Sequence, residues 1–191
     1  KVAANVIAMD GTNWFSSFTI DKGSKEGIKK GMNVIAGSGL VGIVTDVGPN
    51  FAKVRSIIDD SSNVSSMVLT TKDNFNVGGS LKSMNQDKVL PFTELRDEDD
   101  KVKVGDPVVT SYVSDQYQEG ILIGYIASIE KNANNLTKSG TITPVVDFQH
   151  LREVLVITTL KDTGEKELSS QKASDTQAET QDNTETQKSQ E

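Results

Sequence analysis

The sequence predicts an all-β protein built from two tandem, six-stranded antiparallel β-barrel-like domains and a disordered C-terminal tail. Short runs rich in β-branched residues alternate with Gly, Asn, Asp and Pro, a pattern typical of strands and turns. No stretch shows a convincing apolar period of 3.6 residues, as an amphipathic helix would. The strand pattern also repeats once along the chain, and the C-terminal residues are almost devoid of apolar side chains.

Twelve runs are expected as strands, six on each side of residue 71. The first six are 6–9, 15–20, 33–36, 40–47, 53–58 and 64–69. The second six are 76–83, 89–95, 107–111, 122–129, 141–146 and 153–160. We therefore expect a first barrel domain at 1–71 and a second at 72–160, because closure of each sheet removes exposed strand edges.

The two halves align as an internal repeat. The matched segments are 27–35 with 101–109, 40–44 with 122–126, and 53–59 with 141–147. The offset between matched positions grows from 74 to 82 and then to 88 residues, so the second copy carries two insertions. We expect them between strands, within 112–119 and around 132–139, because loops tolerate extra residues.

Residues 161–191 are expected to form a disordered, mildly acidic tail. Leu168 is the only large aliphatic residue among them. Ordering one backbone residue costs about 1–2 kcal/mol, whereas burial of one Leu side chain returns only about 2–3 kcal/mol. The segment is therefore too polar to hold a fixed structure by itself.

Composition excludes several classes of site. The chain of 191 residues has no cysteine, which removes disulfides, thiol chemistry and thiolate zinc sites. Its net charge of −7 argues against nucleic acid as a partner. It contains no apolar run of the roughly 18 residues that a membrane span requires. The chain begins with Lys1 rather than methionine, so we expect it to be cut from a longer protein. No cofactor and no metal is expected.

The segment 37–42 reads GSGLVG and matches the dinucleotide-binding pattern G-x-G-x-x-G. That site needs a helix after the glycines, because the helix N-terminus receives the pyrophosphate. Here the β-branched run 40–47 follows and leads to Gly48 and Pro49. We expect a Gly-rich hairpin turn instead, with Gly42 at a bulge or a point of close packing.

Three groups of polar residues are candidates for a catalytic, metal or anion-binding site. His150 follows Asp147, but no serine nucleophile motif accompanies it, so a loop histidine is favoured over a two-barrel hydrolase. The acidic run 97–100 lacks the alternating spacing of a calcium loop, and a solvated loop is expected. A solvated face, or a weak contact with an anionic surface polymer, is expected for the lysines interleaved with acidic residues, namely Lys22, Lys25, Lys29 and Lys30.

The scarce aromatic residues indicate a partner-binding surface, because such side chains are enriched at binding hot spots. Neighbours in a strand face opposite sides, so one ring of the pair Trp14 and Phe15 is expected at the surface. The alternative is that both rings cover the end of a barrel. Tyr112 and Tyr117 lie in the first insertion, which we expect to be a recognition loop. Substitution of Trp14 or Tyr117 by Ala is accordingly expected to leave stability nearly unchanged.

With these residues laid out, the chain resembles the extracytoplasmic part of the rod shape-determining protein MreC family. One departure concerns residues 112–120, which stand where the family often has a glycine-rich turn and a Pro. The ordered matches cover nearly all of 5–158 and comprise 13–15 (NWF), 19–32 (TIDKGSKEGIKKGM), 39–42 (GLVG), 102–111 (VKVGDPVVTS), 144–147 (PVVD) and 153–156 (EVLV).

The resemblance implies a non-enzymatic scaffold of the bacterial cell-elongation machinery, which controls cell shape by organising peptidoglycan-synthesising enzymes. In the full protein, one membrane-spanning helix and a coiled coil would precede the two barrels. They would anchor the barrels on the outer face of the cytoplasmic membrane. The implied partners are a penicillin-binding transpeptidase, other cell-shape proteins and further copies of the same chain.

A periplasmic adaptor of a transport complex is the alternative. The V-x-V-G-D pattern at 102–106 and the paired β units also suit barrel-sandwich modules such as lipoyl carriers and efflux adaptors. A carrier needs a modifiable lysine, usually flanked by methionine, and the chain has no adjacent Met and Lys. An efflux adaptor would show a long coiled-coil hairpin, which the sequence does not predict.

Overall fold

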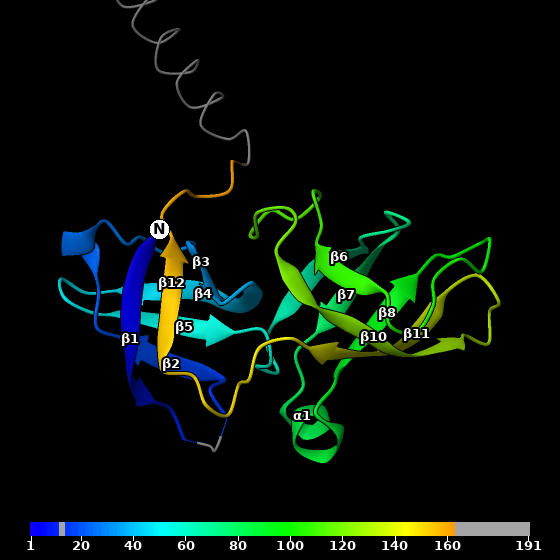
Figure 1. The fold of residues 1–191 in the computed structure, drawn as a ribbon, viewed down its shortest axis with the longest axis horizontal. Helices are drawn as coiled ribbons and strands as arrows, with labels where there is room; N and C mark the ends of the chain where they lie inside the picture. The colour runs from blue at the N-terminus through cyan, green and yellow to red at the C-terminus, as the bar shows by residue number, and fades with distance from the viewer. Residues whose placement is uncertain (12–13, 163–191) are drawn as a thin grey trace, which may run out of the picture. The chain divides into compact units, whose positions relative to one another are not determined.

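The computed structural model describes residues 1–11 and 14–162, and most of its secondary structure is β-strand (Figure 1). The predicted tail, 161–191, lies almost wholly outside the described residues. The strands are β1 (Val2–Met9), β2 (Ser17–Ile20), β3 (Asn33–Ala36), β4 (Gly39–Val47), β5 (Ala52–Ser56), β6 (Asn63–Val68), β7 (Asn74–Gly78), β8 (Leu90–Leu95), β9 (Pro107–Thr110), β10 (Leu122–Lys131), β11 (Lys138–Pro144) and β12 (Glu153–Ile157).

The strands are hydrogen-bonded into two closed circuits of six. The first circuit runs β4-β3-β12-β1-β2-β5 and closes through the pairing of β4 with β5. The second runs β10-β9-β6-β7-β8-β11 and closes through the pairing of β10 with β11. Neighbours within each circuit are antiparallel. The all-β prediction is therefore confirmed.

The circuits are not tandem. The second circuit uses β6 to β11 in succession, whereas the first combines β1 to β5 with the last strand, β12. Two strands therefore pair with strands from the other side of the boundary expected after residue 71. β6 pairs with β7 and β9, and β12 pairs with β1 and β3. Both strands alternate buried and exposed residues in similar ways. Alternation identifies a strand but does not specify its neighbours.

The repeat seen in the sequence extends to individual hydrogen bonds. The N–H of Gly31 donates to the carbonyl of Val44 at 2.8 Å, and the N–H of Gly105 donates to that of Ile126 at the same distance. Both glycines adopt positive φ, +87° and +93°, a backbone region that favours glycine. β4 pairs with β5, and β10 with β11, with an irregularity at the same place in both, directly after Val44 and Ile126.

The GSGLVG segment forms the hairpin turn between β3 and β4, as the sequence predicts. Ala36 pairs with Gly39 across a turn in which Gly37 has φ of +59°. Gly42 lies so close to β5 that a Cβ atom there would stand 2.1 Å from the carbonyl oxygen of Arg55. Gly124 in the second circuit would meet the oxygen of Thr143 at the same 2.1 Å.

The segment expected as a strand at 76–83 is only partly extended. β7 ends at Gly78, and the helix α1 (Leu81–Asp87) follows it. Ser80 caps this helix, because its hydroxyl accepts a hydrogen bond from the N–H of Ser83 at 3.1 Å. Met84 is the buried residue of this helix and belongs to the apolar core. Seven residues are too few for a helical period to be recognised in the sequence.

Each circuit encloses an apolar interior. In β2, β5 and β7 buried residues alternate with less buried ones, which is the pattern expected of a sheet with one buried face. Fully buried examples are Phe18, Ile20, Val34, Leu40 and Val54 in the first circuit and Leu90, Phe92, Val108, Ile123 and Ile142 in the second.

Candidate partner-binding surface

The four aromatic residues predicted to bind a partner lie in different environments. Tyr112 is 55% exposed and Phe15 is half-buried. Trp14 is only 7% exposed and Tyr117 only 2% exposed, so both belong to the apolar core. Burial raises the pKa of the Tyr117 hydroxyl to about 12. The expectation that Trp14 and Tyr117 tolerate truncation is therefore replaced by a structural role for each ring.

Trp14 and Phe15 pack against the first circuit. The N–H of Phe15 donates to the carbonyl of Phe148 at 2.9 Å. The ring of Phe15 meets that of Phe18 edge to face at 6.1 Å between centroids. The ammonium group of Lys88 lies 5.3 Å from the centre of the Trp14 ring, within the range of a cation–π contact. These contacts fit the alternative in which both rings cover a barrel end.

Within the loop between β9 and β10, residues 112–119 contact the first circuit through a buried side chain that no sequence pattern singled out. Asn33 in β3 is 1% exposed. Its amide nitrogen donates to the carbonyl of Gln116 at 2.9 Å, and its amide oxygen accepts the N–H of Gln118 at 2.8 Å. The side chain of Gln118 in turn donates to the carbonyl of Thr159, which follows β12, at 2.5 Å.

The same loop is also braced from within its own circuit. The hydroxyl of Thr110 accepts the N–H of Ile121 at 2.8 Å and donates to the carbonyl of Gln118 at 2.5 Å. The hydroxyl of Ser114 accepts the N–H of Tyr117 at 2.9 Å. Residues 112–119 are therefore a fixed bridge between the circuits, and we call them the bridge loop. It presents exposed apolar side chains at Tyr112 and Val113, 55% and 57% exposed.

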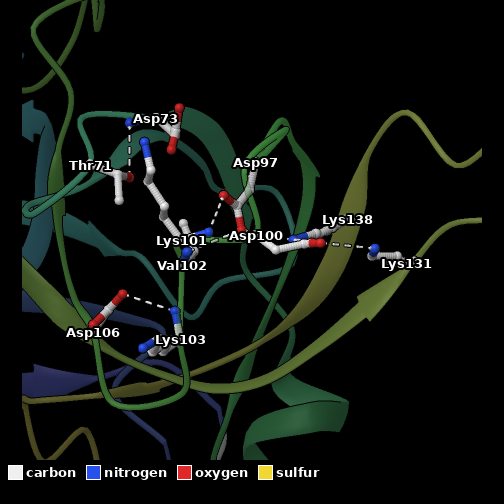
Figure 2. A network of polar contacts seen from close by, with 10 residues as sticks. All are labelled: Thr71, Asp73, Asp97, Asp100, Lys101, Val102, Lys103, Asp106, Lys131 and Lys138. Carbon is white, nitrogen blue, oxygen red and sulfur yellow. Dashed lines mark hydrogen bonds and ion pairs between the residues drawn. The ribbon is translucent and has the colours of Figure 1, made fainter.

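The acidic run 97–100 contains a buried ion pair rather than a wholly solvated loop (Figure 2). Asp97 is 7% exposed and Lys138 is 8% exposed. The ammonium group of Lys138 lies 2.7 Å from a carboxylate oxygen of Asp97 and 2.5 Å from one of Asp100. Asp97 also accepts the N–H groups of Lys101 and Val102, at 2.8 and 3.0 Å. The charges tie the loop after β8 to β11.

The electrostatics of this pair favour its ionised form. Burial alone would raise the pKa of Asp97, but the hydrogen bonds from Lys138, Lys101 and Val102 hold it below the ordinary value. Burial would likewise lower the pKa of Lys138, and the hydrogen bonds to Asp100 and Asp97 raise it instead. Within residues 1–11 and 14–162, no group of three or more His, Cys, Asp or Glu residues is arranged to hold a metal ion.

The remaining polar candidates lie at the surface. His150 Nδ1 is 2.8 Å from a carboxylate oxygen of Asp147, and both side chains are exposed. The hydrogen bond from His150 is the main reason why the pKa of Asp147 lies below its usual value. Most of the lysine cluster is exposed, and Lys22 is half-buried. In the described part of the chain, no helix is long and apolar enough to cross a membrane.

Two hollows follow the outside of the first circuit along β1. One of about 390 Å³ lies over β1, β12 and the β3–β4 turn. The other, of about 510 Å³, lies at the far end of β1. Asn5 and Glu153 line both hollows, so the two are neighbours.

Comparison with known proteins gives a consistent assignment. A model of the family described as "Rod shape-determining protein MreC, barrel core" matches residues 6–158. The cell shape-determining protein MreC of Listeria monocytogenes is 34% identical over 156 residues, which cover 81% of this chain and 52% of that protein. The chain spans about half the length of the curated relatives it matches.

Solved structures of the same family have this fold. The MreC structure from Listeria monocytogenes aligns with a TM-score of 0.73 and 33% identity over 85% of this chain and 78% of that one. MreC from Helicobacter pylori, solved in a complex with the penicillin-binding protein PBP2, aligns with a TM-score of 0.59 and 12% identity. That alignment covers 80% of this chain and 96% of the other.

Proposed function

Because this chain belongs to the MreC family of rod shape-determining proteins, we propose that it is the barrel portion of a non-enzymatic scaffold of bacterial cell elongation. The match over residues 6–158 carries the proposal. In it, the protein controls cell shape by organising enzymes that synthesise peptidoglycan. No observation specific to a transport adaptor supports the alternative.

In this proposal each circuit is one barrel domain, and the two arose by duplication, which the shared register of β4–β5 and β10–β11 supports. The barrels lie on the outer face of the cytoplasmic membrane, anchored by segments outside this chain. A relative that was solved as the major periplasmic domain of a cell shape-determining filament supports this placement. That filament also supports self-association as part of the scaffold's action.

The proposed partner is a penicillin-binding transpeptidase, as in the complex of the Helicobacter pylori relative. Tyr112 on the bridge loop is the proposed contact residue, because it offers an exposed aromatic ring on a loop held from both circuits. Phe15, which is half-buried, is the second candidate. Trp14 and Tyr117 support these surfaces from the core behind them.

The test uses the purified chain and the extracytoplasmic part of the elongation transpeptidase from the same bacterium, with binding measured by biolayer interferometry. We expect saturable binding that Tyr112→Ala weakens about tenfold, the loss of roughly 1.4 kcal/mol expected for a hot-spot ring. Val104→Ala is the matched control, since Val104 is 65% exposed and lies outside the bridge loop. An absence of binding by the unaltered chain would contradict the transpeptidase proposal.

A further inference from the structure

The first circuit has an open stretch of strand edge at the end of β1. Pairing of β1 with β12 ends where Asn5 meets Glu153, and the last bond on that side joins the N–H of Val6 to the carbonyl of Arg152 at 2.8 Å. β1 continues to Met9 and pairs there with β2. Over residues 7–9, no other strand of the described chain pairs with β1.

Met9, which follows the irregularity in the β1–β2 ladder at Ile7, offers its backbone groups at this edge. The N–H of Asp10 donates to the carbonyl of Ser17, so Asp10 directs its backbone groups toward β2. Backbone groups alternate in direction along a strand, and those of Met9 therefore point toward the open side. The second circuit has no such stretch at the corresponding strand, because every residue of β7 pairs with β6.

A hollow of about 510 Å³ lies along the open edge. Its apolar lining includes Ile7 and Met9, which are 59% and 41% exposed, together with Phe15 and Leu151. Solvent-exposed apolar side chains grouped beside an unpaired strand edge are a recurrent sign of a peptide-binding surface. A strand advances about 3.3 Å per residue, so an added segment needs only a few residues to follow this edge.

One cation of the hollow's lining, Arg152, is available to an acidic group of an occupant. Arg152 is exposed and takes part in none of the ion pairs formed among the described residues. A second cation, Lys88, lies over the ring of Trp14, next to Phe15 in the chain. Glu153 is the one acidic residue of the lining and lies opposite Asn5 in the ladder.

We propose that β1 binds an extended segment of a partner protein as an added strand at residues 7–9. Apolar side chains of the segment enter the hollow beside Ile7 and Met9, and one of its carboxylates lies against Arg152. Main-chain hydrogen bonds supply affinity, and the hollow supplies sequence preference, as in other cases of strand addition. This inference rests on the proposed function, because it names the kind of segment that the scaffold takes from its partner.

The test follows amide signals of the isotope-labelled full chain by NMR during titration with synthetic octapeptides that alternate valine and threonine around one glutamate. We expect saturable shifts centred on residues 7–9. Methylation of alternate peptide nitrogens should abolish them, and replacement of the glutamate by lysine should weaken binding about tenfold, a loss typical of one charge pair. Shifts that are absent, or that survive nitrogen methylation, would overturn strand addition.

Ile7→Glu adds a negative charge to the hollow and should weaken peptide binding at least about tenfold, because like charges repel across an interface. Val104→Glu in the second circuit is the matched control. If the transpeptidase binds both variants equally, the edge is not its docking site, although the scaffold proposal stands. If the peptide binds at residues 7–9 but the transpeptidase does not bind the chain, strand addition stands and the choice of enzyme fails.

Discussion

The buried amide oxygen of Asn33 accepts the backbone N–H of Gln118, 85 residues further along the chain, at 2.8 Å. One side chain in the first circuit thereby fixes a loop that belongs to the second. Its amide nitrogen satisfies the carbonyl of Gln116 as well, so both polar ends of the carboxamide are used.

Asn33→Ala should therefore destabilise the protein. It leaves two partly buried backbone groups of the bridge loop, the carbonyl of Gln116 and the N–H of Gln118, without this partner. An unsatisfied buried group costs about 1–3 kcal/mol. We expect the free energy of unfolding, measured by urea denaturation, to fall by about 2 kcal/mol. Asn50→Ala, at an exposed position, is the control. Equal stability of the two variants would mean that Asn33 does not hold the loop.

Thermal melts should show different losses of stability for Ala variants of buried and of exposed aromatic residues. Trp14→Ala and Tyr117→Ala each remove a core ring and should cost about 3–5 kcal/mol. Tyr112→Ala should change stability by less than about 0.5 kcal/mol, as is usual at exposed positions. A melt of Tyr117→Ala that coincides with that of the unaltered chain would place this ring outside the core.

The Asp97–Lys138 pair should make stability depend on pH. The pKa of Asp97 is lower in the folded than in the unfolded protein. The contribution of Asp97 to stability is therefore present above the unfolded pKa and is lost as pH falls through the folded pKa. The pKa of Lys138 is higher folded than unfolded, so its pH dependence is the opposite. Its contribution to stability is present below the unfolded pKa and is lost as pH rises through the folded pKa.

Asp97→Asn leaves Lys138 without its most buried partner and should cost about 3 kcal/mol at neutral pH. The difference from the unaltered chain should shrink in acid, where Asp97 becomes protonated and uncharged. Urea denaturation at pH 7 and below pH 3 measures both. Glu98→Gln, at an exposed neighbouring position, is the control. A difference that is the same at both pH values would show that the charge of Asp97 is not the cause.

Removal of β12 should disrupt the first circuit. A chain that ends at residue 152 leaves β1 and β3 without the strand that joins them. We expect loss of the cooperative melt of that circuit and aggregation through the new edges. A chain that ends at residue 161 keeps all twelve strands and is the control. Identical melts for the two chains would contradict the pairing of β12 with β1 and β3.

Much of the fold could be predicted from the sequence, because the relevant signals are local or repeated. Runs of β-branched residues between Gly, Asn, Asp and Pro indicated the strands. The alignment of Gly31 with Gly105 matched two residues that make equivalent hydrogen bonds. The partners of β6 and β12 could not be predicted in the same way. Pairing depends on contacts between distant segments, and both strands satisfy the pattern of either circuit.

The candidate surface was predictable only in part. The insertion at 112–119 lies between two strands, β9 and β10, as predicted, and Tyr112 in it is exposed. The burial of Tyr117 and of Asp97 depends on partners elsewhere in the chain. Asn33 holds the loop that contains Tyr117, and Lys138 pairs with Asp97. The one available signal for Asn33 was its place at the start of the apolar run 33–36, since a buried amide requires partners.

The place of β12 at the end of the strand sequence also determines the order in which the fold can be completed. Strands β6 to β11 are consecutive, so the second circuit can close as soon as they have emerged from a ribosome or a secretion channel. The strands β1 to β5 of the first circuit emerge earlier, but the circuit cannot close until β12 has emerged and paired with β1 and β3. A chain that emerges from its N-terminus therefore finishes its second half first, and its earliest strands remain exposed for the longest time.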